Sequence, residues 1–218
     1  MEPILRTADT ADWIGILVLL SMLLPVLAKS FFYSRFINFI ILPFNNKYIF
    51  MYNKKEKLLN WFHVLFTIFM FINLSVFVYL AGEILFSGST EEYSFRYPII
   101  LGCLLGFILL KVVLQLGNGF IFESNKAMSE LIFKKLSYLN YTGIVMFVAN
   151  LILGYTFSDS RIVVFITIFL ILSINVIGWV TLLRIHQKFI TNYFFYFILY
   201  LCALEISPLV IIGSYLNG

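Results

Sequence analysis

The stretch IVVFITIFLILSI, residues Ile162–Ile174, decides the fold class of this protein. Eleven of its thirteen residues are apolar. They follow one another without the alternation of polar and apolar residues that a membrane β-barrel strand needs. The run lies in an apolar segment, residues 162–183, which is long enough to cross roughly 30 Å of hydrocarbon as a helix. We therefore expect an all-α membrane protein.

Five other segments have the same character, so the predicted spans cover residues 13–28, 58–86, 98–116, 138–157, 162–183 and 189–216. Of the 218 residues, 61% are hydrophobic and only 12% are charged, whereas soluble domains carry about 25% charged residues. One core in a chain of this length cannot bury so much apolar surface. The composition excludes a soluble globule and predicts a polytopic protein with six transmembrane helices, short loops and one integral membrane domain over residues 1–218.

Basic residues are distributed unevenly between the connections. One set of connections holds eleven Lys and Arg residues and three acidic residues, whereas the opposite set holds three basic and seven acidic residues. Basic connections are retained on the cytoplasmic side of a membrane. The first set is therefore predicted to lie inside, with both termini outside.

Two of the inner connections are predicted to contain interfacial segments. Phe36–Phe44 is apolar but too short to span, which indicates an interfacial or re-entrant element. Residues 120–136 place apolar side chains at helical spacing, as in an amphipathic helix on the membrane surface. Their basic residues form a predicted surface for anionic lipid headgroups or, alternatively, for a protein partner. Its members are Lys47, Lys54, Lys55, Lys57, Lys134 and Lys135. Nucleic acid is not expected as a partner, because no nucleic-acid-binding motif accompanies the charge.

Two ionisable residues fall inside predicted spans, where charge is costly and therefore indicates a specific role. Lys111 follows Pro98 by thirteen residues, and Glu205 precedes Leu216 by eleven. At 1.5 Å per residue, these positions lie about 20 Å and about 17 Å below the same face. We expect Lys111 and Glu205 to form a buried ion pair, which acts either as a structural clamp or as a proton or ion relay. Snorkelling of Lys111 to the interface is the alternative.

Other residues of the spans predict helix shape and packing. Pro208 and Pro25 each remove a backbone donor and predict a kink. Gly102 and Gly106 form a small-residue face for close helix packing, within the chain or between two copies of it. The remaining polar residues near the middle of the spans are neutral, namely Asn73, Asn150, Asn175 and Gln115.

The sequence offers few candidates for catalysis. Its two histidines, His63 and His186, show no metal-binding spacing, and both are interpreted as hydrogen-bonded residues near the inner interface. The chain has no phosphate-binding glycine loop, no HExxH motif and no nucleophile elbow. No cofactor, metal or catalytic residue is predicted.

Three segments carry a resemblance to a known family: residues 43–48 (PFNNKY), 134–143 (KKLSYLNYTG) and 195–209 (FYFILYLCALEISPL). With their order and spacing, they make the chain resemble the uncharacterised multi-spanning inner-membrane proteins of Bacteroidota that are catalogued as a domain of unknown function. The likeness covers almost the whole chain. It implies a single-domain protein of a bacterial inner membrane and brings no established activity or site residues.

Two functions remain open from the sequence. The first is a non-catalytic membrane subunit or assembly factor of cell-envelope or protein-export machinery, with a membrane-protein partner or a second copy of the chain. The second is a small transporter or proton-coupled channel that uses Lys111, Glu205 and the kink at Pro208.

Overall fold

The computed structural model describes residues 11–45, 47–52, 60–85, 97–107, 125–157 and 160–185. These residues are almost entirely helical and contain no strand. Their contacts divide the chain into two compact units, residues 1–178 and 179–218. The packing described below belongs to the first unit, which includes α8 up to Gly178.

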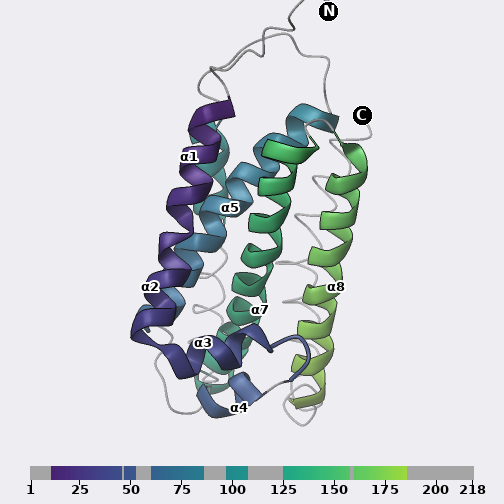
Figure 1. Cartoon of the computed structure of the whole chain (residues 1–218). Helices are drawn as coiled ribbons and strands as arrows, with labels where there is room; N and C mark the ends of the chain where they lie inside the picture. Colours follow the sequence, from purple (N-terminus) through teal and green to yellow (C-terminus); the bar gives the residue numbers. More distant parts are fainter. Residues whose placement is uncertain are drawn as a thin grey trace, which may run out of the picture. The chain divides into compact units, whose positions relative to one another are not determined.

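Four candidate membrane spans are long and apolar enough to cross a bilayer (Figure 1). The first, Trp13–Phe31, combines α1 (Ala11–Ser21) and α2 (Leu23–Phe31). The second is α5 (Trp61–Leu85). The third, Ile132–Thr156, lies in α7 (Asn125–Leu151) and the π-helix η1 (Ile152–Thr156), and the fourth, Arg161–Thr181, lies in α8 (Arg161–Ile185).

These spans correspond to four of the six predicted ones. A shorter apolar helix, Tyr97–Phe107, occupies the start of the predicted span 98–116, and the rest of that span and the whole of 189–216 lie outside the described residues. Six spans and external termini stay predictions, while the all-helical class and four membrane-compatible helices are established for the described part.

The predicted surface helix over residues 120–136 differs from the structure. From Asn125 onward the chain forms one helix, α7, that continues to Leu151. The reason is local: no proline or glycine occurs between Asn125 and Tyr141, so nothing interrupts the helix before it enters the span.

Two short helices close one end of the unit: α3 (Tyr33–Ile40) and α4 (Lys47–Tyr52). In Figure 1, α3 crosses the end of the unit where α2 finishes. One apolar stripe points inward and consists of Phe32, which precedes α3, and of Phe36 and Phe39 in α3. The Phe39 ring lies 4.5 Å from Phe66 of α5 and 5.8 Å from Tyr141 of α7. The α3–α4 segment therefore packs on α5 and α7 through aromatic rings.

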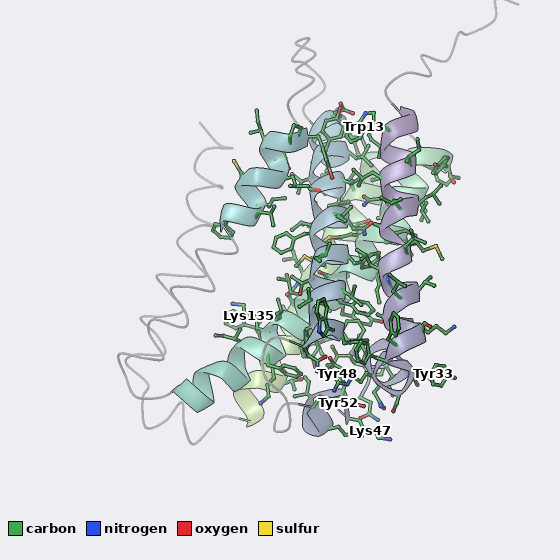
Figure 2. The ribbon with its side chains drawn as sticks, turned by 90° about the vertical axis from the view of Figure 1, so that its left-hand side faces the viewer. Trp13, Tyr33, Lys47, Tyr48, Tyr52 and Lys135 are labelled. Atoms are coloured by element: carbon green, nitrogen blue, oxygen red, sulfur yellow. The ribbon has the colours of Figure 1, made fainter. Side chains whose placement is uncertain are left out.

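Aromatic residues also gather at the opposite end of the unit. The ring of Trp13 in α1 lies 5.9 Å from Tyr79 of α5 and 4.9 Å from Tyr97. Figure 2 shows Trp13 at one end and Tyr33, Tyr48 and Tyr52 at the other. Along α5, Trp61 and Tyr79 are eighteen residues apart, about 27 Å at helical rise. Amphipathic rings at this separation match the two interfaces of a bilayer.

Helices α5 and α7 approach each other closely at Gly143. A Cβ atom on Gly143 of α7 would lie 2.9 Å from Met70 Cα and 3.0 Å from Met70 Cβ of α5. Only a residue without a side chain permits this approach. Gly143 is therefore a close-packing glycine in addition to the predicted Gly102 and Gly106, whose role stays a prediction.

Candidate functional site

Buried polar side chains form two clusters along the α5–α7 interface. The first surrounds His63, which is buried in the first turn of α5. His63 Nε2 lies 3.3 Å from the Tyr48 hydroxyl of α4 and 3.5 Å from Ser137 Oγ of α7. Asn140 donates from Nδ2 to His63 Nδ1 over 3.4 Å and to Thr67 Oγ1 over 3.1 Å. The histidine cluster therefore links α4, α5 and α7.

Both ring nitrogens of His63 lie near polar partners, and their donor and acceptor roles follow the tautomer of the ring. The Ser137 hydroxyl also donates to the Phe133 carbonyl over 2.7 Å. His63 is thus a hydrogen-bonded residue near the end of a span, in agreement with its interpretation from the sequence.

Aromatic rings enclose this cluster. The Phe133 ring lies 4.6 Å from His63 and is stacked on Tyr48 at 6.2 Å. Burial raises the pKa of the Tyr48 hydroxyl above its ordinary value, and the nearby charge of Arg35 offsets part of this rise. Arg35 itself lies over the Tyr52 ring at 4.9 Å. Tyr48 therefore holds α4 onto α5 and α7 as a neutral hydrogen-bonding group.

The second cluster lies at the middle of α5 and joins three helices. Asn73 of α5 donates to Ser21 Oγ of α1 over 3.1 Å and to the Phe69 carbonyl over 2.9 Å. Asn150 of α7 donates to the Asn73 carbonyl over 2.9 Å and to Asn73 Oδ1 over 3.4 Å. The exposed fractions of Ser21, Asn73 and Asn150 are 1%, 0% and 2%. We call this group the amide cluster.

Helix irregularities lie beside the amide cluster on two of its three helices. The α1 helix ends at Ser21, and α2 begins at Leu23 after a turn at Met22. On α7, Leu151 follows Asn150 and the π-helix η1 begins at the next residue, with Phe157 N bonded to the Ile152 carbonyl over 2.8 Å. The π-helix forms the last turn of the third span, and the chain leaves the helix at Phe157.

Apolar side chains separate the two clusters. Between His63 and Asn73, α5 presents Phe66, Phe69 and Met70, all buried to at least 98%. Met70 also marks the close approach of Gly143. The polar groups of the described interface therefore form two separate hydrogen-bonded clusters with a packed apolar layer between them.

Several predicted site residues lie outside the described residues, namely Lys111, Glu205, Pro208, Lys54, Lys55 and Lys57. Their roles stay predictions. Pro25 is the third residue of α2 and follows the turn at Met22 by three residues. A Cβ atom on Gly102 or Gly106 would have no described atom within 4 Å.

The structure describes only three of the six residues of the predicted basic surface, namely Lys47, Lys134 and Lys135. Lys47 is exposed at the start of α4. Lys134 is 2% exposed, so it does not form part of an open surface. The reason is that α7 continues through this position, and its neighbours Ile132 and Phe133 are buried there as well. Lys135 is partly buried on the same turn.

In the sequence, Asn73 and Asn150 stand out only as neutral polar residues of the spans. Their partnership crosses 77 residues of sequence, and nothing local to either residue indicates it. An amide side chain is costly to place in hydrocarbon without a hydrogen-bond partner. The sequence therefore predicts that each Asn has a partner, but it does not identify that partner. Within the described ranges, no group of three or more His, Cys, Asp or Glu residues is arranged to hold a metal ion.

The chain was compared with curated proteins and with solved structures, and neither comparison found a match. The family model described as Domain of unknown function (DUF4271) matches residues 14–216, which is nearly the whole chain. The protein therefore belongs to this family of uncharacterised proteins.

Proposed function

We propose that this protein is a non-catalytic membrane subunit or assembly factor of cell-envelope or protein-export machinery in a bacterial inner membrane. The observation that carries the proposal is the apolar outer stripe of α8. Phe165, Phe169, Leu172 and Val176 recur at helical spacing and are all exposed. Of the four candidate spans, the one in α8 is the least buried by the rest of the chain.

A stripe of this kind suits side-by-side contact with a helix of another membrane protein. Helix association in lipid depends on van der Waals packing along a continuous surface. The stripe carries two aromatic and two aliphatic side chains and no polar group. The interior is held by hydrogen bonds between neutral side chains of α5 and α7, which favours a fixed scaffold that presents α8 to a partner.

The α3–α4 end supports anchoring to anionic lipid. Tyr33, Ile37 and Phe44 are exposed, and Phe44 reaches 91%. Residues 29–55 contain five basic residues and no Asp or Glu. Apolar side chains beside basic ones are typical of interfacial segments that contact anionic headgroups. We propose that this segment rests on the inner leaflet.

Photocrosslinking in native membranes tests the subunit function. A photoreactive amino acid replaces Phe169, which is 69% exposed, and in a matched control it replaces Val164, which is 0% exposed on the same helix. The proposal predicts one discrete product with a second protein from position 169 and none from position 164. Products with lipid alone from position 169 would contradict it, and a product at twice the chain mass would replace the partner with a second copy.

A second candidate function is a small transporter or proton-coupled channel. The specific observation in its favour is the amide cluster, where the interruption between α1 and α2 meets buried polar groups near the middle of α5. Discontinuous helices at mid-membrane are a recurring ingredient of transporters. This function also invokes the predicted pair of Lys111 and Glu205. Ion or proton flux in proteoliposomes that is unchanged by Glu205→Gln, in a folded variant, would dismiss the relay.

A further inference from the structure

Helix α3 carries a second apolar stripe besides the one that packs on α5 and α7. This outer stripe consists of Tyr33, Ile37 and Ile40, which are 61%, 45% and 38% exposed. Its members recur at intervals of four and three residues, so they lie on one side of the helix. The turn that follows adds two more exposed apolar residues, Ile41 and Phe44. Helix α3 therefore presents a continuous apolar surface to its surroundings.

The α3 helix has three sides of different character. The inward stripe of Phe36 and Phe39 meets the protein core, and the outer stripe is exposed. The remaining side holds polar residues only: Ser34, Arg35 and Asn38. At about 100° per residue, the centres of the three sides lie roughly 100° to 140° apart. A helix with this arrangement can contact protein, acyl chains and water at the same time.

The contacts of α3 with α5 indicate the depth of α3. In Figure 1, α3 runs across the direction of the spans. The Phe39 ring lies 5.6 Å from Phe62 and 4.5 Å from Phe66. Phe62 and Phe66 follow Trp61, where the span begins, by one and five residues, which is about 1.5 to 7.5 Å at helical rise. Interfacial helices bury their apolar side about 5 to 10 Å into the boundary between headgroups and acyl chains. The outer stripe is therefore level with the start of the acyl chains.

The charge around α3 has one sign. Lys29 is exposed in the last turn of α2, and Lys47 is exposed at the start of α4. On the polar side of α3, the guanidinium carbon of Arg35 lies 4.9 Å from the centre of the Tyr52 ring. Residues 13–55 contain no Asp or Glu. Basic side chains beside an exposed apolar stripe match the phosphate groups and acyl chains of anionic phospholipids.

We propose that α3 is an in-plane membrane helix whose partner is anionic glycerophospholipid. Its outer stripe lies among the acyl chains of one leaflet, while Lys29, Arg35 and Lys47 contact phosphate groups of the same leaflet. This inference deepens the proposed anchoring of the α3–α4 end, on which it rests, because it places α3 below the headgroups and adds Arg35 to the lipid contacts. It does not depend on the subunit function.

Site-directed spin labelling tests the depth of α3. The label is attached to Ile37→Cys on the outer stripe and, as the matched control, to Asn38→Cys on the polar side. Both are made in the full chain with Cys103→Ser and Cys202→Ser, in vesicles of phosphatidylethanolamine and phosphatidylglycerol. Electron paramagnetic resonance compares the accessibility of the label to oxygen, which concentrates among acyl chains, and to a water-soluble nickel chelate. The proposal predicts a higher ratio of oxygen to nickel accessibility at position 37 than at position 38, and an equal or lower ratio would overturn the insertion of α3.

A second pair on the same helix, Tyr33→Cys and Ser34→Cys, provides the same comparison if either of the first labels disturbs the fold. Both side chains are exposed, so a label replaces no buried contact. The higher ratio of oxygen to nickel accessibility is expected at position 33, because it belongs to the outer stripe. The reverse order would contradict the insertion in the same way.

Counting bound lipid tests the lipid class. In native mass spectrometry, the triple variant Lys29→Gln, Arg35→Gln and Lys47→Gln is expected to retain less phosphatidylglycerol per chain than wild type. The control is Arg161→Gln, an exposed position at the start of α8 and at the opposite end of the unit (Figure 1), which should retain as much as wild type. Undiminished phosphatidylglycerol in the folded triple variant would overturn the assignment to anionic lipid. Wild type in an equal mixture of phosphatidylglycerol and phosphatidylcholine should retain an excess of the former, and equal retention would overturn the same assignment without any variant.

The two tests separate failure of this inference from failure of the proposed anchoring. A water-exposed label at position 37, together with loss of phosphatidylglycerol from the triple variant, would overturn the insertion of α3 and leave the anchoring in place. A label among acyl chains with undiminished phosphatidylglycerol in the triple variant would overturn both the anionic partner and the anchoring through basic residues.

Discussion

Substitution of Gly143 by alanine is expected to weaken the α5–α7 interface, although alanine is the better helix former. The new Cβ would lie 2.9 Å from Met70 Cα and 3.0 Å from Met70 Cβ. Carbon atoms in good contact are about 3.5 to 4.0 Å apart, so the helices must separate by about 0.5 to 1 Å. Overpacking of this kind costs about 1 to 3 kcal/mol. Shortening Met70 does not relieve it, because the nearest atom belongs to the backbone.

Gly82 provides the matched control within α5. A Cβ atom there meets nothing within 4 Å among the described residues. Gly82→Ala is therefore expected to stabilise by about 0.5 to 1 kcal/mol through helix propensity alone. Since both substitutions gain the same propensity, the difference between them isolates the steric cost of Gly143→Ala.

The assay is reversible unfolding of each variant in lipid bicelles, with the free energy of unfolding measured by steric trapping. Gly143→Ala is predicted to unfold more easily than Gly82→Ala by about 1 to 3 kcal/mol. Equal free energies for the two variants would refute the close approach of α5 and α7 at Met70.

Three further predictions concern the α3–α4 end. The free energy of unfolding is expected to fall as the pH rises above about 10, by up to about 1.4 kcal/mol per pH unit. The reason is that Tyr48 ionises at its ordinary pKa of 10.0 in the unfolded chain, whereas its buried hydroxyl stays protonated in the folded one. A Tyr48→Phe variant with the same alkaline slope as wild type would disprove this. Phe39→Ala should lower the free energy of unfolding by about 3 to 5 kcal/mol, because Phe39 is fully buried. The control Phe44→Ala, at an exposed position, should change this free energy little. Equal losses for the two variants in bicelle unfolding would contradict the packing of α3. The double variant Lys29→Gln with Lys47→Gln should retain less phosphatidylglycerol on purification than wild type, and undiminished retention in quantitative lipid mass spectrometry would remove these residues from the lipid contact.

The spans were the most predictable part of the fold. Three described spans begin and end within three residues of the segments 13–28, 58–86 and 162–183, and the remaining one begins six residues before the segment 138–157. This agreement has a simple cause: a continuous apolar run of this length can only be satisfied as a helix in lipid. The predicted surface helix over residues 120–136 forms one continuous helix with the span from Asn125 onward, because charged residues end the apolar pattern of a span without ending the helix itself.

The two buried polar clusters could not be predicted from the sequence, for a different reason. Asn150 contacts Asn73 and Asn140 contacts His63 across 77 residues in each case. Such pairs depend on the rotation and register of α5 against α7, which composition and periodicity do not determine. The close-packing glycine shows the same limit, since no small residue lies four positions before or after Gly143 to mark it in the sequence.

The α3–α4 segment lies between these extremes. Its length and charge indicated an interfacial or re-entrant element, and α3 does form a helix with one buried and one exposed apolar face. Tyr48 contacts His63 and so holds α4 against the spans. Only the folded structure reveals this contact. Local pattern thus indicates the character of such a segment more readily than what it contacts.

The mass of the particle that contains this protein in its own membrane tests the proposed function most directly. Extraction into lipid nanodiscs without conventional detergent, followed by native mass spectrometry, gives that mass after the lipid is removed in the gas phase. The chain alone has a mass of 25.3 kDa. A subunit or assembly factor is predicted to appear with a second, different polypeptide in a fixed ratio. A particle with the mass of one chain would contradict the subunit function.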